Sequence, residues 1–378
     1  VIEDAQNKGI KVLYSDSITK DRFVTILDKD GYIKIKNIEK LFNENKDKHY
    51  RSFGKQYIHL NGYKALTLNP NNSKPEWRLI KRIIRHKTNK KIYKVNQKYG
   101  ESITTEDHSF ISNGLMEYTP MELKKQNLPM TTVQKIPPVK EIKQIDLFEL
   151  IKSYNYSAIY KKRKKIAYAK ADRKWIWFGW TNRKIPIKVK RHIKVDSKEF
   201  KSLCRIIAYY INEGSSSTPE TTKSRLGASI SNSDIKKLKQ LQNDYYNLFI
   251  NAKSSIIPSM TKKRYLNYKV GNISKFISYD DKTHKLQMMN ILSAVLFKVL
   301  CGQKSKCKKL PDFIYHVPDK YKILLLNTLI EGDGSRIFGL RYSKKYSKNN
   351  FRYTTSSLEL ISGLSLLLRQ LDINYSIQ

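Results

Sequence analysis

Two apolar segments of the chain end in the same short pattern, a carboxylate followed by glycine. Residues 206–214 carry Glu213 and residues 326–334 carry Asp333. Apolar residues at helical spacing predict two buried helices, and glycine can take the positive φ that stops a helix. If the helices pack side by side, the two carboxylates meet at one end. Two hard oxygen ligands there can hold Mg²⁺ beside a phosphodiester, where the metal activates a water and stabilises the leaving oxygen.

These two helix ends resemble the paired LAGLIDADG motifs of homing endonucleases. The first segment has the variant ending Tyr-Ile-Asn-Glu-Gly, and the second matches the motif at Leu326, Leu329, Ile330, Asp333 and Gly334. The resemblance implies a long, specific double-stranded DNA substrate, Mg²⁺ bound by Glu213 and Asp333, and a monomer with a pseudo-twofold endonuclease. The alternative is two ordinary helices with glycine caps.

A lysine upstream of the second segment is a further candidate for the chemistry. Lys308 begins the stretch 308–314, Lys-Lys-Leu-Pro-Asp-Phe-Ile. An ammonium group can polarise an attacking water or stabilise charge on a phosphate. A similar Lys-x-apolar-Pro block occurs in inteins, the self-splicing insertions that carry such endonucleases, and the resemblance places Lys308 near the cleavage site. The alternative is a surface lysine before a helix that proline initiates.

A second constellation lies in the N-terminal part of the chain. Ser17 opens a run of strands, and Thr105 and His108 form a Thr-x-x-His string. Both resemble intein blocks, which implies that Ser17 Oγ attacks the carbonyl of Asp16 and converts an amide to an ester. His108 titrates near neutrality and can carry the proton to the leaving nitrogen, while Thr105 supports the oxyanion. The alternative for the string is a capped turn followed by a strand.

The residues before Ser17 resemble part of a DNA polymerase. The stretch 11–16, Lys-Val-Leu-Tyr-Ser-Asp, is similar to the start of the family B motif Tyr-x-Asp-Thr-Asp-Ser. That motif presents carboxylates to two Mg²⁺ ions, and Asp16 would be its first metal ligand. The resemblance implies an intein that interrupts the active site of a polymerase, whose activity belongs to the spliced host. We expect the chain to be truncated before its C-terminal splice junction, because no His-Asn pair closes it at Gln378.

The elements that must position these residues indicate an α+β chain of four parts. Residues 1–16 are expected to be the polymerase fragment, with a helix, a turn and a strand. Residues 17–135 are rich in strands and resemble the N-terminal part of the all-β Hint splicing fold. Residues 136–200 form a basic DNA-recognition segment, and residues 201–378 form a truncated LAGLIDADG endonuclease of two αββ-type repeats.

Hydrophobic periodicity predicts where individual strands and helices lie. Strands are expected at residues 23–27, 34–36, 63–68, 79–85 and 92–97. Helices are expected at residues 38–43, 120–125, 200–212, 235–248, 319–330 and 358–371.

The charge of the chain indicates a polyanionic partner. Lysine and arginine total 73 against 33 acidic residues, a formal net charge of +40, and nucleic acid is the partner that such an excess favours. The basic run 160–165 predicts DNA contact. For the tryptophans of residues 175–180, an aromatic core face is favoured over stacking on bases. Anionic membrane is disfavoured, because we find neither an amphipathic basic helix nor an apolar run of about 18 residues.

Cysteine usage and the N-terminal residues predict an intracellular protein. Cys204, Cys301 and Cys307 include no CxxC pair, which disfavours a zinc site or disulfides and favours small buried side chains. No secretion signal is present at the start of the sequence. We therefore expect a non-secreted protein in the cytoplasm or nucleus of a viral or archaeal system.

Two other functions remain open on the sequence alone. The chain could be a non-catalytic DNA-binding remnant of an intein, although both acids are retained. It could also be a free-standing homing endonuclease or a transcription factor with no splicing history. Ser17 and the Thr105 and His108 block speak against the second alternative.

Overall fold

The computed structural model describes residues 18–377, apart from short gaps at 46–48, 70–71, 73, 113, 115, 127–134, 161–162, 179–185, 220–225, 260–262, 271–272, 281–282 and 337–350. For residues 156–160, 163–167, 263–270, 273–280 and 335–336 it describes the backbone alone. The chain divides into two compact units. Unit 1 comprises Val1–Lys140 with Ile361–Gln378, and unit 2 comprises Glu141–Leu360.

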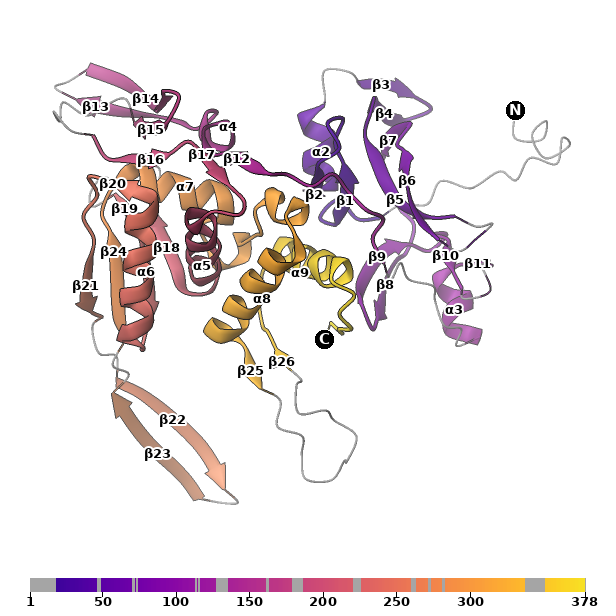
Figure 1. The fold of residues 1–378 in the computed structure, drawn as a ribbon. Helices are drawn as coiled ribbons and strands as arrows, with labels where there is room; N and C mark the ends of the chain where they lie inside the picture. The colour runs from indigo at the N-terminus through magenta and orange to yellow at the C-terminus, as the bar shows by residue number, and fades with distance from the viewer. Residues whose placement is uncertain are drawn as a thin grey trace, which may run out of the picture. The chain divides into compact units, whose positions relative to one another are not determined.

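Unit 1 is built mainly from antiparallel strands (Figure 1). One sheet has the order β2-β1-β5-β6, a second has the order β3-β4-β7, and two pairs are β8-β9 and β10-β11. The first two sheets share a core of Ile26, Leu41, Phe42, Ile58 and Leu60. The bounds of these elements are β1 Phe23–Leu27, β2 Ile33–Asn37, α2 Ile38–Glu44, β3 His49–Ser52, β4 Lys55–His59, β5 Lys64–Leu68, β6 Pro75–Leu79, β7 Arg82–Arg85, β8 Ile92–Gln97, β9 Gly100–Thr105, β10 Phe110–Ile111, β11 Glu117–Tyr118 and α3 Pro120–Gln126.

Unit 2 places helices against a four-stranded antiparallel sheet of order β18-β19-β24-β21. The bounds of its elements are β12 Gln144–Asp146, α4 Leu147–Ile151, β13 Asn155–Tyr160, β14 Arg163–Ala171, β15 Trp175–Phe178, β16 Lys188–Lys190, β17 His192–Lys194, α5 Lys198–Glu213, β18 Gly214–Ser217, β19 Gly227–Asn232, α6 Ile235–Leu248, β20 Phe249–Ile250, β21 Ser255–Pro258, β22 Lys263–Val270, β23 Ile273–Asp280, β24 His284–Met288, α7 Ile291–Cys301, the short 3-10 helices η2 Ser305–Cys307 and η3 Asp312–His316, α8 Asp319–Asp333, β25 Ser335–Arg336 and β26 Phe351–Arg352. Helix α9, Leu358–Gln370, begins in unit 2 and continues in unit 1.

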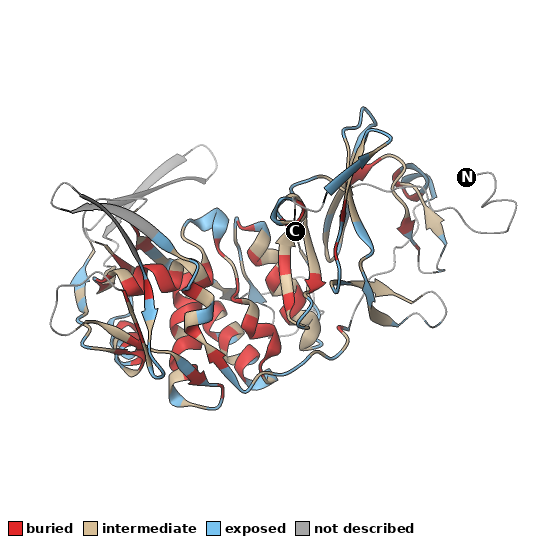
Figure 2. Cartoon of the chain, turned by 90° about the horizontal axis from the view of Figure 1, so that it is seen from above, coloured by how far each residue is buried: buried red, intermediate tan, exposed pale blue. Residues whose placement is uncertain are grey.

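Helix α5 is the central buried element of unit 2. Ser197 caps its first turn by accepting a hydrogen bond from the amide of Phe200, and ten of its side chains are buried. Buried residues are concentrated in the helices of this unit (Figure 2). Helices α6, α7 and α8 all pack on α5, so that a helix with apolar residues on most of its surface is covered on several sides.

The mixed α and β composition that the sequence predicts is confirmed. Strands β1 and β8 and helix α6 have the predicted bounds, and the other five predicted helices differ by at most three residues at either end. The single strand predicted at 79–85 is wrong. Leu79 ends β6, which pairs with β5, whereas β7 pairs with β4. The apolar run therefore spans a change of sheet, which periodicity cannot show. The elements predicted in residues 1–16 lie outside the described residues.

Two of the three cysteines are buried as predicted. Burial raises the pKa of the Cys204 and Cys301 thiols to about 12. Cys307 is exposed, so the prediction was wrong for this residue. It lies in η2, which has no buried residue. Within the described parts of the chain, no helix is both long and apolar enough to cross a membrane.

Candidate functional site

Helices α5 and α8 bring the two acid-glycine endings together. The helices pack along each other (Figure 1), and their ends are joined by the side chain of Asn212, which donates from Nδ2 to the carbonyl oxygen of Leu329 at 2.9 Å. Gly332 allows this approach, because a Cβ on Gly332 would lie 2.0 Å from Asn212 Nδ2. The last turns of the two helices are therefore in direct contact.

Both helices end in extended backbone, which corrects the expectation of a positive φ. Gly214 has φ −84° and Gly334 has φ −76°. Each glycine instead begins or immediately precedes a strand, and each amide donates to the carbonyl four residues earlier, Tyr210 or Ile330. A Cβ at either position would lie 2.4 Å from that same carbonyl oxygen. The glycines are needed for space at a helix-to-strand junction rather than for left-handed backbone.

The two carboxylates lie at the exposed end of this buried helix pair. Glu213 and Asp333 are both exposed. Tyr353 directly follows β26 and is affected by both carboxylates. Burial raises the pKa of its phenol, and the negative charges of Asp333 and Glu213 raise this pKa further. One hydroxyl can respond to both carboxylates only if both lie within a short electrostatic range of it. Both acids thus lie within electrostatic range of Tyr353, on helix ends that are in contact.

Lys308 lies beneath the end of α5. The residue is 5% exposed, and its ammonium group donates to the carbonyl oxygens of Tyr210 at 2.6 Å and Gly214 at 2.8 Å. It also lies 3.8 Å from the centre of the Tyr210 ring. Burial lowers the pKa of Lys308 to about 8, whereas Cys301 and Glu213 oppose this shift. The alternative of a surface lysine is therefore wrong, because the side chain is needed to satisfy carbonyls that the helix leaves open.

The donor set at the helix tips fits a divalent cation. Two exposed carboxylates on rigid, touching helices are hard oxygen ligands of the kind that Mg²⁺ takes, and such a site needs few protein ligands because waters and phosphate oxygens complete it. Within the described residues, no cluster of three or more His, Cys, Asp or Glu side chains could hold a metal.

The sheet of unit 2 offers a polar face beside the α5 tip. Ala228, Ile230, Leu286 and Met288 are buried on one face. On the other face, a row of polar side chains crosses the sheet in register: Ser215, Ser229, Gln287 and Ser255. The hydroxyls of Ser215 and Ser229 lie 3.0 Å apart. Such hydroxyls and amides can donate to and accept from base edges and phosphates.

The basic segment contributes a second sheet, of order β13-β14-β15-β16-β20. Ile176 and Phe178 fill its core, while Trp175 and Trp177 alternate with them and are half-buried. The ammonium of Lys188 lies 5.2 Å from the centre of the Trp177 ring. The expectation that the tryptophans form a core face is therefore wrong for Trp175 and Trp177, because Ile176 and Phe178 fill the core and the two tryptophans share the opposite face with lysines.

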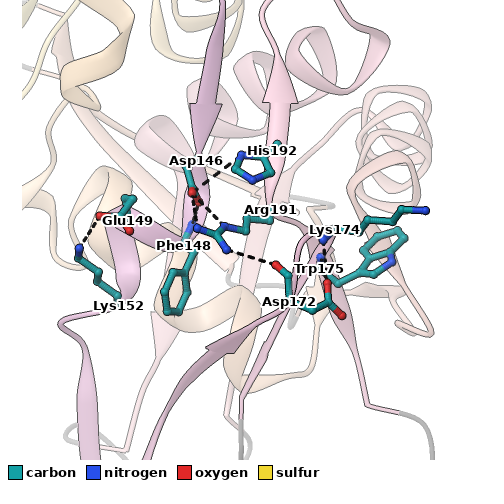
Figure 3. A network of polar contacts seen from close by, with 9 residues as sticks. All are labelled: Asp146, Phe148, Glu149, Lys152, Asp172, Lys174, Trp175, Arg191 and His192. Carbon is teal, nitrogen blue, oxygen red and sulfur yellow. Dashed lines mark hydrogen bonds and ion pairs between the residues drawn. The ribbon is translucent and has the colours of Figure 1, made fainter.

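An ion-pair network holds this sheet to its neighbours (Figure 3). Asp146 caps α4 by accepting from the Phe148 amide at 2.9 Å and pairs with Arg191 at 2.8 Å. Burial alone would raise the pKa of Asp146, but the bonds from Arg191 and from the Phe148 amide outweigh it, and the pKa lies below its usual range. Asp172 turns the chain between β14 and β15 by accepting from the amides of Lys174 and Trp175, both at 2.7 Å.

The Thr-x-x-His string lies at the end of the β8-β9 hairpin in unit 1. Thr105 is the last residue of β9 and is buried, and His108 follows a turn in which its amide donates to the Thr105 carbonyl at 3.1 Å. The His108 ring packs edge-on against Phe110, with ring centres 5.0 Å apart. The string thus spans the end of a strand and the turn that leads to β10, and the contact with Phe110 orients the imidazole.

The first described residues pair with the same strand. Ile18 forms an antiparallel bridge with Thr104, and the amide of Thr19 donates to the Ile103 carbonyl at 3.0 Å. The predicted nucleophile Ser17 and the predicted ligand Asp16 lie outside the described residues. Ile18, the residue covalently joined to Ser17, is therefore paired next to Thr105.

Comparisons with known proteins relate parts of the chain to DNA polymerases. A DNA polymerase of Thermococcus aggregans is 38% identical over 160 residues, which is 41% of this chain and 8% of the polymerase. A DNA polymerase of Acanthamoeba polyphaga mimivirus is 38% identical over 108 residues, 27% of this chain and 6% of the polymerase. A DNA gyrase protein of Mycobacterium malmoense is 28% identical over 116 residues, 29% of this chain and 23% of that protein. The aligned stretches thus make up less than a quarter of each relative, and no protein-family model matches the chain.

Sequence reasoning missed two residues of the candidate site, Asn212 and Tyr353. Asn212 directly precedes Glu213, but nothing in the motif indicates that its amide has a role. Tyr353 lies 141 residues further along the chain, and no local pattern marks it. Only the packing of the two helix ends brings these side chains together.

Proposed function

We propose that this chain is an intein-type insertion of a family B DNA polymerase and that unit 2 is a site-specific DNA endonuclease. Its substrate is double-stranded DNA, and Glu213 and Asp333 hold Mg²⁺ at the cut. The observation that carries the proposal is the contact between the α5 and α8 ends, which places two exposed carboxylates within electrostatic reach of the same hydroxyl.

The reaction follows from the arrangement of the side chains. The chemistry that Mg²⁺ would supply, when held by Glu213 and Asp333, is a lowered pKa of a bound water and stabilisation of the leaving oxygen. Glu213 and Asp333 hold the cation where the phosphodiester arrives, and the rigid helix pair keeps the separation of the carboxylates fixed. Lys308 holds the α5 terminus, and its ammonium group adds positive potential under the carboxylates. The polar sheet face and the lysines beside Trp177 supply contacts to bases and phosphates.

The relatives support an insertion more than they support a polymerase activity of this chain. DNA polymerases from two Thermococcus strains and a virus share short stretches with it, and so does a DNA gyrase protein, whose name is different. Similarity to a small fraction of differently named proteins is what a transferable insertion produces. We therefore assign the polymerase activity to the spliced host.

The nuclease is tested by removing each carboxylate separately. Glu213→Gln and Asp333→Asn in the full chain keep the shape of the side chains and remove one charge each. We expect cleavage of a plasmid that carries the uninterrupted polymerase gene to fall by at least about a hundredfold, because electrostatic stabilisation of this kind is worth factors of 10²–10³. Binding to the same DNA should persist.

The measurements are single-turnover cleavage with Mg²⁺ and DNA binding by fluorescence anisotropy. Cleavage that survives both substitutions would exclude these acids as the metal ligands. A wild-type protein that binds the DNA but neither nicks nor cuts it would support the decayed DNA-binding remnant instead.

The pairing of Ile18 with Thr104 supports a second activity, an acyl shift at Ser17. Ile18, which is covalently bonded to Ser17, pairs with Thr104, the neighbour of Thr105 in the chain. In this proposal Ser17 Oγ attacks the Asp16 carbonyl, the peptide C–N bond breaks, and His108 delivers a proton to the departing nitrogen. The product is an ester, which strong nucleophiles cleave.

The acyl shift is tested with hydroxylamine. A precursor with a reporter protein fused before residue 1 should release the reporter, extended by residues 1–16, when hydroxylamine is added. Ser17→Ala should abolish release, and His108→Ala should slow it by about 10²–10⁴-fold, the usual contribution of general acid catalysis. Release that is unaffected by Ser17→Ala would show that the bond is cleaved in another way.

A further inference from the structure

The junction of α5 and α8 contains a hydrogen-bonded pair that neither helix motif requires. Asn212 uses both ends of its amide there. Its Nδ2 donates to the Leu329 carbonyl of α8 at 2.9 Å, and its Oδ1 accepts from the Tyr353 hydroxyl at 2.8 Å. One side chain thus connects the last turn of α5, the last turn of α8 and the segment that follows β26.

The packing around Asn212 shows that the site is shaped for it. The corresponding position of the second helix end is Gly332, and a Cβ there would collide with the amide of Asn212 at 2.0 Å. A larger residue on one helix is therefore matched by the smallest residue on the other. Because its Nδ2 has an acceptor and its Oδ1 has a donor, the positions of the amide nitrogen and oxygen are both fixed.

Tyr353 retains its proton in these surroundings. Burial and the negative charges of Asp333 and Glu213 raise its pKa, so the phenol remains a donor across the pH range in which an enzyme works. A neutral hydroxyl can stand close to two carboxylates without the repulsion that a phenolate or a third acid would introduce. Its bond to Asn212 then persists while the carboxylates are charged.

We propose that Asn212 and Tyr353 are positioning residues of the nuclease, which set the separation of Glu213 and Asp333 by fastening α5 to α8 and to the segment after β26. The inference rests on the proposed function of the two acids. Neither residue needs to touch the DNA, because each acts through the backbone that carries a carboxylate. Outer side chains that orient ligands in this way typically change metal affinity or activity by 10–100-fold when they are replaced.

The experiment compares two tyrosines that each lose one hydroxyl. Tyr353→Phe removes the bond to Asn212. Tyr245→Phe is the matched control, because the hydroxyl of the buried Tyr245 is also hydrogen-bonded, to Ser293 and Asn290, away from the helix ends. Tyr353→Phe removes one part-buried hydrogen bond and Tyr245→Phe removes two buried ones, so that a purely structural effect should be at least as large in the control.

We expect Tyr353→Phe to lower kcat for cleavage of the uninterrupted polymerase gene by about 10–100-fold. The KM for DNA should stay within about twofold of wild type, and the Mg²⁺ concentration for half-maximal rate should rise. Tyr245→Phe should leave both quantities unchanged. Asn212→Leu should act like Tyr353→Phe, and the double variant should be no worse than the more impaired single one, because the two residues work as a unit.

The outcomes separate this inference from the proposed nuclease. If Glu213→Gln and Asp333→Asn abolish cleavage while Tyr353→Phe behaves like Tyr245→Phe, the positioning role is excluded and the nuclease stands. If the acid variants still cleave, the nuclease assignment fails first.

If the wild-type protein is inactive, the positioning role can be tested by measurements that need no turnover. Mn²⁺ affinity followed by electron paramagnetic resonance, together with hydrogen exchange at Gly214 and Gly334, should show weaker metal binding and faster exchange in Tyr353→Phe than in Tyr245→Phe. Equal affinity and equal exchange in the two variants would overturn the positioning role.

Discussion

Lys308 shows how a residue chosen for its chemistry can also be structural. Its ammonium group bonds the carbonyls of Tyr210 and Gly214, the residues that lead out of α5 and into β18. A cation at a helix C-terminus is favoured by the helix dipole, but burial of the charge opposes it. The lowered pKa is the result of these opposing effects, with burial dominant.

Because of the lowered pKa of Lys308, the free energy of unfolding should depend measurably on pH. Its pKa is about 8 in the folded protein and 10.5 when unperturbed. Below pH 8 the amine is protonated in both states and contributes no slope. Between these values the unfolded state holds more protons, so the free energy of unfolding gains on the order of 3 kcal/mol as pH rises. Lys308→Met should lose this gain.

The check is urea unfolding of wild type and Lys308→Met at several pH values from about 7 to 10.5, with the difference in unfolding free energy plotted against pH. Lys306→Met, which removes an exposed lysine of the preceding η2 helix, controls for the loss of one charge. A difference that is flat with pH would show that Lys308 titrates alike in the folded and unfolded chains.

At the level of helices and strands, the contact between the ends of α5 and α8 depends on the absence of a Cβ at Gly332. Gly332 lies inside the last turn of α8, where alanine would ordinarily stabilise the helix by about 1 kcal/mol. The contact with Asn212 reverses this preference, because a Cβ would overlap the amide. Overpacking of this kind costs about 1–3 kcal/mol.

Gly332→Ala should therefore lower the free energy of unfolding by up to about 2 kcal/mol, the net of these two effects. In an Asn212→Ala background the same change should be neutral or stabilising, since the amide that it meets is gone. Urea unfolding of the four proteins in this cycle measures the coupling. Equal effects of Gly332→Ala in both backgrounds would contradict the contact.

Helix positions could be predicted from the sequence because their causes are local. The caps of α2, α5 and α6 are side chains next to the helices they begin, and the periodicity lies within each segment. The extended backbone of Gly214 and Gly334 could not be predicted, because it depends on the strand each helix enters. The burial of Lys308 and the place of Tyr353 depend on packing between distant segments.

For the molecule as a whole, charge predicts the class of partner and the motifs predict the pair of acids, while the structure adds that the helix ends carrying these acids are in contact. The net charge of +40 would accompany many nucleic-acid proteins. The specific assignment rests instead on Glu213, Asp333 and the Ile18–Thr104 pairing. Residues 16 and 17 could be interpreted from the sequence alone and stay predictions.

The chain path through the two units has a bearing on how the protein folds. Residues 361–378 belong with residues 1–140: Tyr375 packs edge-on against Tyr99, and the amide of Ile377 donates to the Lys98 carbonyl at 2.8 Å. The whole of unit 2, residues 141–360, separates these partners in sequence. During synthesis, unit 1 therefore cannot be completed until all of unit 2 has been synthesised. Because the entropy of closing a loop grows only with the logarithm of its length, the long separation adds little to the free-energy cost of completing unit 1.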